Sequence, residues 1–174
     1  MIEILKNPKT GSYRNLKRYV LSHEIPLFYQ EESTPQLDTS DGHVNIPYFS
    51  HEILKRPETS RISVPEPVSH LLSDASDVCR EILEYNNVSM HFFVRMCVNV
   101  VNPFKDVLKS IQHTDHEFYH KNLLIYFTSS GGKTFVGEEN FDPTEDSVIT
   151  FGGHQHYHES PKSERRVVLV ATYI

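Results

Sequence analysis

The chain has 174 residues, of which 38% are hydrophobic and 23% charged, as is usual for a soluble protein with one folded core. Its net charge of −6 argues against a surface that follows nucleic-acid phosphates. No stretch reaches the roughly 18 apolar residues that a membrane-spanning helix needs, and the N-terminus lacks the long apolar segment of a signal peptide. Cys79 and Cys97 offer no disulfide framework, so we expect a cytoplasmic protein with a single domain over residues 1–174.

The N-terminal half, residues 1–90, is expected to support a core that follows it. Residues 25–30 and 44–49 resemble outer strands, and residues 31–42 between them form a polar segment rich in Ser, Thr and Asp. We expect this segment to be a surface excursion, with a lid over an active site as the alternative.

One amphipathic helix is predicted between residues 66 and 85. Pro65 and Pro67 mark its start, and Asn86 and Asn87 mark its end. Its apolar positions keep a three-four spacing, which gives one buried face to pack against a sheet. These positions are Val68, Leu71, Leu72, Ala75, Val78, Cys79, Ile82 and Leu83.

The C-terminal half contains a series of short apolar segments separated by turn signals. The turns are expected at residues 129–132, 142–144 and 152–153. Several short strands spaced in this way predict a mainly β fold of the jelly-roll kind, with flanking α-helices. We place the core at about residues 91–174, with strands at residues 92–101, 123–127, 133–136, 147–151 and 166–173.

Three side chains in this half could bind a metal. In extended chain, residues i and i+2 point to the same side, so His113 and Asp115 can hold one ion together. His158 follows Asp115 by 43 residues and could complete two histidines and one carboxylate, the facial triad that binds Fe(II) and leaves other positions open. His154 and His156 would share a face with His158, and a solvated polar loop is the alternative for a chain with 11 histidines.

The order of these motifs resembles the prolyl-4-hydroxylase-like branch of the Fe(II)/2-oxoglutarate-dependent dioxygenases. The resemblance covers about residues 95–174 and implies a double-stranded β-helix core. It depends on the following segments: His113-Thr114-Asp115, Leu124-Ile125-Tyr126-Phe127, Gly131-Gly132-Lys133-Thr134, Phe151-Gly152-Gly153, Tyr157-His158 with Pro161, and Arg165-Arg166-Val167-Val168-Leu169.

The resemblance implies a role for each matching residue. The metal ligands, and with them the catalytic centre, would be His113, Asp115 and His158. Arg166 would pair through its guanidinium with the distal carboxylate of 2-oxoglutarate. Tyr126 would contact the same carboxylate, and Asn99 would help at the other end of the cosubstrate.

Two of these assignments have alternatives. Arg165 competes with Arg166, because residues 167–171 are apolar throughout and do not reveal which arginine faces inward. The family histidine stands six residues after the phenylalanine, which here is Tyr157, so His158 requires one extra residue at Gly152-Gly153. His156, ten residues before Arg166, is the alternative third ligand. A tyrosine that some relatives carry ten residues before the first histidine is replaced here by Pro103.

The function implied is oxidative decarboxylation of 2-oxoglutarate coupled to hydroxylation of a substrate. Fe(II), 2-oxoglutarate and O2 would take part, with ascorbate as a further candidate. The leading substrate expectation is a protein side chain such as prolyl, and a small molecule is the other. The alternatives are a non-catalytic jelly-roll binding or structural module and a cupin-like metal-binding protein using His154, His156 and His158. Only 16 residues follow His158, too few for the second half of a cupin site.

Overall fold

The computed structural model describes residues 1–32 and 42–174, so most of the predicted polar segment 31–42, and its lid alternative, lies outside the described residues. In chain order the elements are β1 (Glu3–Leu5), α1 (Gly11–Val20), β2 (Phe28–Gln30), β3 (His43–Val44), β4 (Tyr48–Lys55), β5 (Glu66–Pro67), α2 (Leu72–Tyr85), β6 (Phe93–Val101), β7 (Lys109–Ser110), β8 (Lys121–Tyr126), β9 (Thr134–Val136), β10 (Glu139–Phe141), β11 (Val148–Gly152), β12 (His156–His158) and β13 (Arg166–Tyr173).

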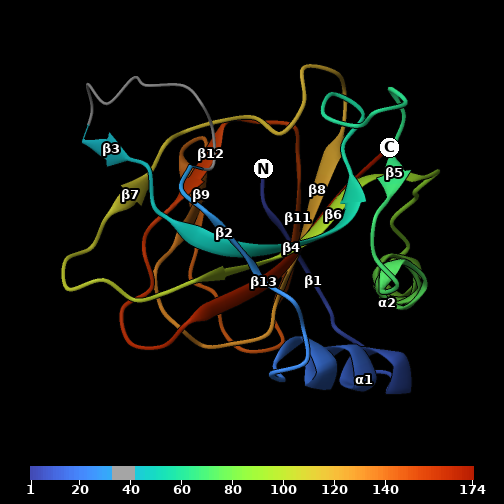
Figure 1. The fold of residues 1–174 in the computed structure, drawn as a ribbon, viewed down its shortest axis with the longest axis horizontal. Coiled ribbons are helices and arrows are strands. Elements are labelled where there is room, and N and C mark those ends of the chain that lie inside the picture. Colours follow the sequence, from blue (N-terminus) through green and yellow to red (C-terminus); the bar gives the residue numbers. More distant parts are fainter. Residues whose placement is uncertain (33–41) are drawn as a thin grey trace.

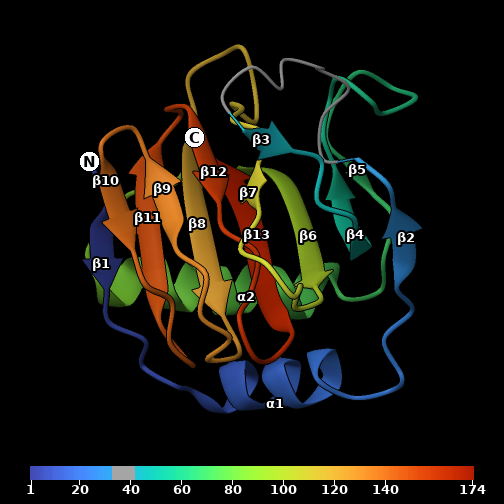
Figure 2. The ribbon, with the colours of Figure 1, turned by 90° about the vertical axis from the view of Figure 1, so that its left-hand side faces the viewer.

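The strands form one large sheet and two small ones. The large sheet has the order β1-β11-β8-β13-β6-β4-β2, with β5 paired to β4. The second sheet has the order β10-β9-β12, and β3 pairs with β7 in parallel. The large sheet lies between the helices on one side and the small sheets on the other (Figures 1 and 2). The predicted mainly β fold with flanking helices is confirmed.

Side chains of the large sheet alternate between two buried faces. On β13, Val167, Leu169 and Ala171 join the cluster that packs against α1 and α2. Val168 points the other way, into a second cluster between the sheets that includes Leu124 and Phe151. Because both faces are covered, the strand is apolar at nearly every position. This double burial is the reason that residues 167–171 carry no alternating pattern.

The two helices differ in how well the sequence predicted them. Helix α2 begins at Leu72, later than predicted, because Pro67 still pairs with β4. Helix α1 was not predicted, since only Tyr13, Leu16 and Val20 are buried among its ten residues. Its start is capped by Thr10, whose hydroxyl oxygen accepts a hydrogen bond from the Tyr13 N–H at 3.2 Å.

The expected strands are present, with bounds shifted by a few residues. The last strand, Arg166–Tyr173, matches its prediction, and the segment 44–49 divides between β3 and β4. Cys79 on α2 and Cys97 on β6 are free and buried, as expected of small apolar side chains. Neither helix within the described ranges is long and apolar enough to cross a membrane.

Asp146 joins α1 to the large sheet. Its carboxylate accepts hydrogen bonds from the Tyr13 hydroxyl at 2.6 Å and the Lys17 ammonium at 2.5 Å, and Lys9 lies 2.8 Å away. Burial alone would raise the pKa of Asp146, but its bonds to Lys17, Lys9 and Tyr13 lower it from 3.8 to about 2. The folded state therefore favours the ionised carboxylate.

We predict that Asp146→Asn lowers the free energy of unfolding at neutral pH by roughly 2 kcal/mol. Asn tolerates the positive φ of 67° at this position, so the change mainly removes the charge. The stability difference should be complete above the unfolded pKa of about 3.9 and shrink as the pH falls towards 2. Denaturant unfolding across this pH range tests it. Glu145→Gln is the control, because Glu145 contacts Lys17 from an exposed position and should cost less than about 0.5 kcal/mol.

Gly132 lies in the turn between β8 and β9, packed against the chain that precedes β13. Its φ is +79°, and a Cβ there would lie 2.5 Å from the Ser160 carbonyl oxygen. Gly137 has a φ of +56° but has nothing within 4 Å of such a Cβ. Both Gly→Ala variants carry backbone strain, whereas only Gly132→Ala adds a clash. We predict that Gly132→Ala costs roughly 1–3 kcal/mol more than Gly137→Ala in thermal unfolding. Equal losses would contradict the predicted clash.

Candidate metal centre

His113 and His156 are brought together by their backbones. The two residues form an isolated antiparallel bridge in which each N–H donates to the other carbonyl, at 3.0 and 2.9 Å. Residues paired in this way point their side chains to the same side of the ladder. The imidazole centroids are accordingly 4.5 Å apart. The histidine pair is therefore fixed by main-chain hydrogen bonds rather than by side-chain contacts.

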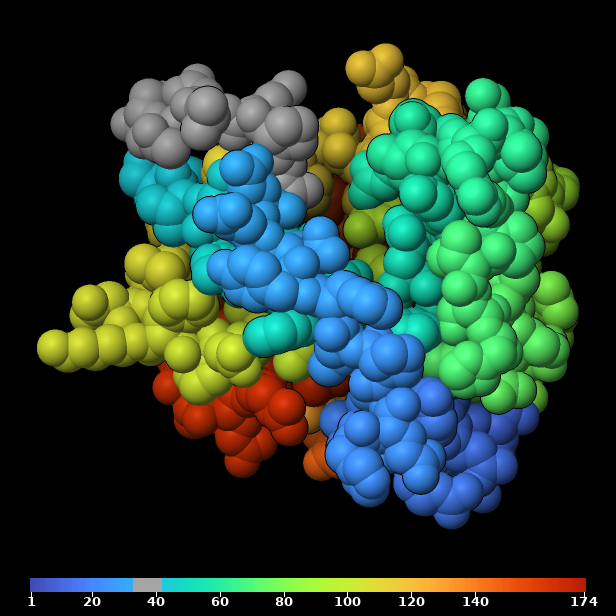
Figure 3. All heavy atoms as spheres, in the orientation of Figure 1, coloured from blue at the N-terminus to red at the C-terminus, as the bar shows by residue number. Residues whose placement is uncertain are grey.

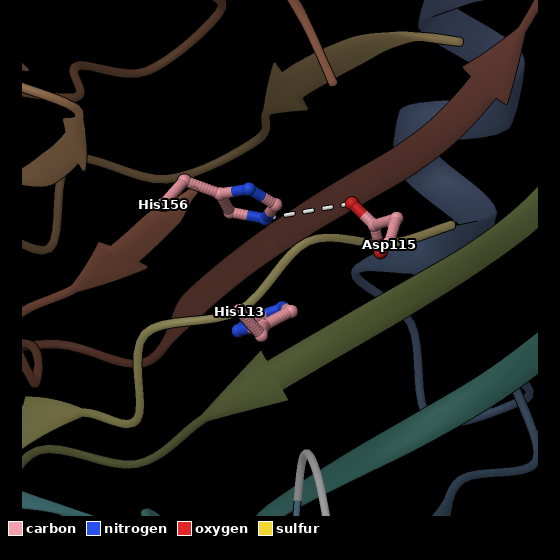
Figure 4. A group of neighbouring side chains, drawn as sticks. All are labelled: His113, Asp115 and His156. Carbon is pink, nitrogen blue, oxygen red and sulfur yellow. Dashed lines mark ion pairs between the residues drawn. The ribbon is translucent and has the colours of Figure 1, made fainter. Parts of the chain in front are cut away.

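Asp115 completes a group of three possible metal ligands with His113 and His156. One ligand atom from each residue lies within 4.8 Å of the others, and the three side chains converge in front of β13 (Figure 4). The Asp115 Oδ1 accepts a hydrogen bond from the Arg95 guanidinium at 2.7 Å. Its Oδ2 is buried without a hydrogen-bond partner and lies 3.4 Å from the His156 Nε2. An unpaired buried carboxylate oxygen facing two imidazoles fits a divalent cation in donor type and direction.

His158 does not join this group, although the sequence predicted it as the third ligand. It stands two residues further along β12, opposite Thr134, and its N–H donates to the Ser110 hydroxyl at 2.9 Å. The alternative, His156, lies beside His113 and Asp115 instead. His156 stands five residues after Phe151, whereas His158 stands seven residues after it.

The cupin-like arrangement is not formed within the described part of the chain. His154 is exposed, and the only group of three metal-capable side chains found there is the one that contains His156. The three alternating histidines therefore have three different environments: solvent for His154, the ligand group for His156 and the Ser110 side of the cavity for His158.

Arg166 lies in a cavity of about 100 Å³ that the ligand group also lines. The side chain is 3% exposed. One Nη donates to the Thr134 hydroxyl and lies 3.4 Å from the Tyr126 hydroxyl, and the other lies 3.4 Å from the Gly132 carbonyl oxygen. No carboxylate within the described residues pairs with Arg166. A buried guanidinium held by neutral groups can receive a ligand carboxylate.

The other predicted cosubstrate residues take distinct places. Arg165 is exposed, whereas Arg166 faces the cavity. Tyr126 is fully buried, and its hydroxyl shares a hydrogen bond with the Thr134 hydroxyl at 2.8 Å. The guanidinium carbon of Arg166 lies 5.2 Å from the centroid of the Tyr126 ring. Asn99 lines the cavity, and its Oδ1 accepts from the Ser50 hydroxyl at 2.8 Å.

Strand register places the two ends of the cavity. Arg166 is opposite Val101 and Thr172 is opposite Arg95 in the β13–β6 ladder. Six residues separate Arg166 from Thr172, roughly 20 Å of strand. Arg166 and Arg95 therefore mark opposite ends of one inner face, with Val168 and Asn99 between them.

Two outer cavities border this inner one. A cavity of about 550 Å³ shares Tyr48 and Arg95 with it, and one of about 350 Å³ shares Arg56, His113 and Asp115. The first lies where the surface is hollowed between the segments that carry β2 and β5 (Figure 3). A ligand could therefore approach the three metal-capable side chains from outside.

The surroundings of Asp115, His113 and His158 favour the forms of these side chains that can bind a metal. Burial would raise the pKa of Asp115, but Arg95, His156 and His113 hold it well below the usual range. Burial, and then the neighbouring His156, lower the pKa of His113. Burial, and then Arg166, lower the pKa of His158 to about 3. An ionised carboxylate and neutral imidazoles are the species that coordinate metals.

The sequence reasoning missed three residues of this site. Arg95 and Arg56 both contact Asp115, and Thr134 orients Arg166. One signal was available: Arg95 and Asn99 are polar residues at alternating positions of an otherwise apolar strand, which places them on one face. Arg56 had none, because its contact with Asp115 crosses 59 residues of sequence.

No protein-family model matches the chain, and no curated protein matches it in sequence.

Among the solved structures that share its fold, three illustrate the match. An oxidoreductase of the 2OG-Fe(II) oxygenase family from Burkholderia pseudomallei superimposes with a TM-score of 0.67 at 15% identity, over 99% of this chain and 84% of that one. A prolyl hydroxylase from Trichoplax adhaerens, in complex with a peptide fragment of the hypoxia inducible factor oxygen degradation domain, gives 0.61 at 11% identity, over 99% and 83%. The non-heme alpha ketoglutarate dependent epimerase SnoN gives 0.58 at 12%, over 99% and 77%. The chain therefore has the double-stranded β-helix fold of 2-oxoglutarate/Fe(II) oxygenases, as the sequence predicted.

Proposed function

We propose that this protein is an Fe(II)- and 2-oxoglutarate-dependent dioxygenase that hydroxylates its substrate. His113, Asp115 and His156 would hold the metal, and Arg166 would hold the distal carboxylate of the cosubstrate. The fold shared with 2OG-Fe(II) oxygenases supports the class. The observation that carries the proposal is the unpaired Oδ2 of Asp115, which faces two imidazoles in the cavity that also contains a buried arginine.

The donor set is compatible with iron. Two neutral imidazoles and one carboxylate form the facial triad of non-heme Fe(II) enzymes, and the described group contains no thiolate of the kind that binds Fe–S clusters. The iron and cosubstrate, when bound, supply the oxidising chemistry. The protein would bind and orient the cosubstrate and exclude water from the site.

The chain binds and orients the cosubstrate through the Arg166 end of the cavity. Thr134 and Tyr126 hold one Nη of the guanidinium, and the other lies 3.4 Å from the carbonyl oxygens of Gly132 and Glu159, so the cosubstrate carboxylate would be the charged partner that these neutral groups do not supply. Leu124 and Val168 line the wall beside it and keep water from the buried charge. Asn99, held by Ser50, offers its amide N–H groups to the same cavity.

The substrate we propose is a protein side chain, with prolyl as the leading candidate. A structural neighbour of this chain is a prolyl hydroxylase bound to a peptide fragment. The cavity of about 550 Å³ is large enough for several side chains, and it borders the metal-side cavity at Tyr48 and at Arg95, which bonds Asp115. Release of succinate in the presence of proline-containing peptides, compared with matched alanine peptides, tests this choice.

One prediction of this proposal concerns the third ligand. Anaerobic Fe(II) and 2-oxoglutarate should together give the weak metal-to-ligand charge-transfer band of a chelated cosubstrate. His156→Ala should abolish this band, because it removes a donor and should weaken iron binding on the order of 100-fold. His158→Ala should keep the band, since His158 lies outside the ligand group.

The same titrations distinguish the alternatives. Loss of the band in His158→Ala with retention in His156→Ala would contradict the assignment of His156. A folded wild-type protein without any band would favour a non-catalytic binding or structural module instead.

Another prediction of the proposal concerns Arg166. Arg166→Gln should raise the 2-oxoglutarate concentration needed for half of the band at least about 30-fold, because a carboxylate then lies in the cavity without a cation. The affinity of the site for the metal alone, measured by isothermal titration with Mn(II) in place of Fe(II), should be unchanged. Arg165→Gln is the matched control and should leave both titrations as in the wild type, since Arg165 is exposed. Equal weakening in both variants would contradict the role of Arg166.

A further inference from the structure

We propose that Arg95 is a positioning residue that holds Asp115 to one-oxygen coordination and so keeps a metal position open. This inference rests on the proposed function, because it concerns the same metal site. The side-chain hydrogen bond of Arg95 within the described residues is to Asp115, and Arg95 lies at the end of the cavity opposite Arg166.

The geometry divides the two oxygens of Asp115 between two tasks. Its Oδ1 accepts a hydrogen bond from the Arg95 Nη at 2.7 Å, and its Oδ2 is unpaired and faces His156. The Arg95 side chain is 15% exposed and the Asp115 side chain 3%. A charge-assisted hydrogen bond between such buried groups is strong, so Oδ1 is not free to turn towards the metal.

The division matters because of coordination number. A carboxylate can bind a metal through one oxygen or two. Two histidines, a two-oxygen carboxylate and a chelating 2-oxoglutarate would together fill all positions of a six-coordinate iron. With Oδ1 retained by Arg95, one position stays available for O2. Arg95 thereby protects reactivity rather than metal affinity.

Arg56 provides a natural comparison. It also contacts Asp115, but its Nη1 donates to the backbone carbonyl at 2.8 Å, and its Nη2 is 3.7 Å from Oδ1, beyond hydrogen-bond distance. Arg56 therefore supplies positive charge near the carboxylate without engaging either oxygen. Substituting Arg56 removes a nearby positive charge, whereas substituting Arg95 also removes the hydrogen bond to Oδ1. Comparing the two variants therefore separates the effect of charge from the effect of that hydrogen bond.

The experiment uses nitric oxide as a probe of the open position. Wild-type, Arg95→Met and Arg56→Met proteins are loaded anaerobically with Fe(II) and 2-oxoglutarate, and the charge-transfer band confirms loading. Nitric oxide is then added, and the EPR signal of the iron nitrosyl is measured. We expect the signal in wild type and Arg56→Met, and a loss of at least about 10-fold in Arg95→Met at an equal charge-transfer band.

Several results would overturn the inference. A nitrosyl signal in Arg95→Met as large as in the wild type would overturn it, and so would an equal loss of signal in Arg56→Met. A folded Arg95→Met protein that binds no iron would also overturn it, because freeing Oδ1 should add a metal donor rather than remove one. If Arg95→Met does not fold, Arg95→Gln retains one neutral N–H for Oδ1 and should give a signal between the two extremes; a full signal there also overturns it. A missing charge-transfer band in the wild type would refute the proposed function itself, which keeps the two failures distinguishable.

Discussion

Burial of the large sheet on both faces is the constraint on which this structure depends. The odd-numbered positions 167–173 of β13 pack against α1 and α2, and the even-numbered positions 166–172 face the interior between the sheets. The helix side contains most of the apolar core, so the interior side is free to carry polar groups. Arg166 and Arg95 occupy that interior face, at opposite ends of one cavity. The helices thus stabilise the sheet from one side, and its other face carries the polar and charged side chains of the candidate site.

Much of this organisation is readable in the sequence, for physical reasons that differ between elements. The strand Arg166–Tyr173 could be predicted because an uninterrupted run of β-branched and apolar residues is typical of a strand that is buried on both faces. Helix α1 escaped prediction because three buried side chains in ten residues produce a weak periodic signal. Its position depends on tertiary bonds to Asp146, which lies roughly 130 residues away and leaves no local trace.

The metal centre shows the same limit at finer scale. In an extended chain His154, His156 and His158 would share one face, so alternation could not choose among them. In the structure the backbone pair with His113 brings His156 into the group, a long-range register that sequence spacing does not encode. The length of the turn between Phe151 and β12 decides which histidine stands opposite His113. Gly153 lies in this turn, where a Cβ would come within 2.6 Å of the His120 ring, so the turn is packed closely against the chain that precedes β8.

The charges of the site follow from the same architecture. The described interior contains three arginines, Arg56, Arg95 and Arg166, but Asp115 is the carboxylate that meets two of them, and Arg166 meets neutral groups. Burying cations without matching anions costs free energy, so an excess of positive charge persists only where something else supplies the counter-charge. In the function we propose, a dianionic cosubstrate would meet that need at the Arg166 end and complete a pair that the folded chain leaves open. At the other end Arg95 is already paired with Asp115, so the two buried arginines would have different roles, one towards the cosubstrate and one towards the metal ligand.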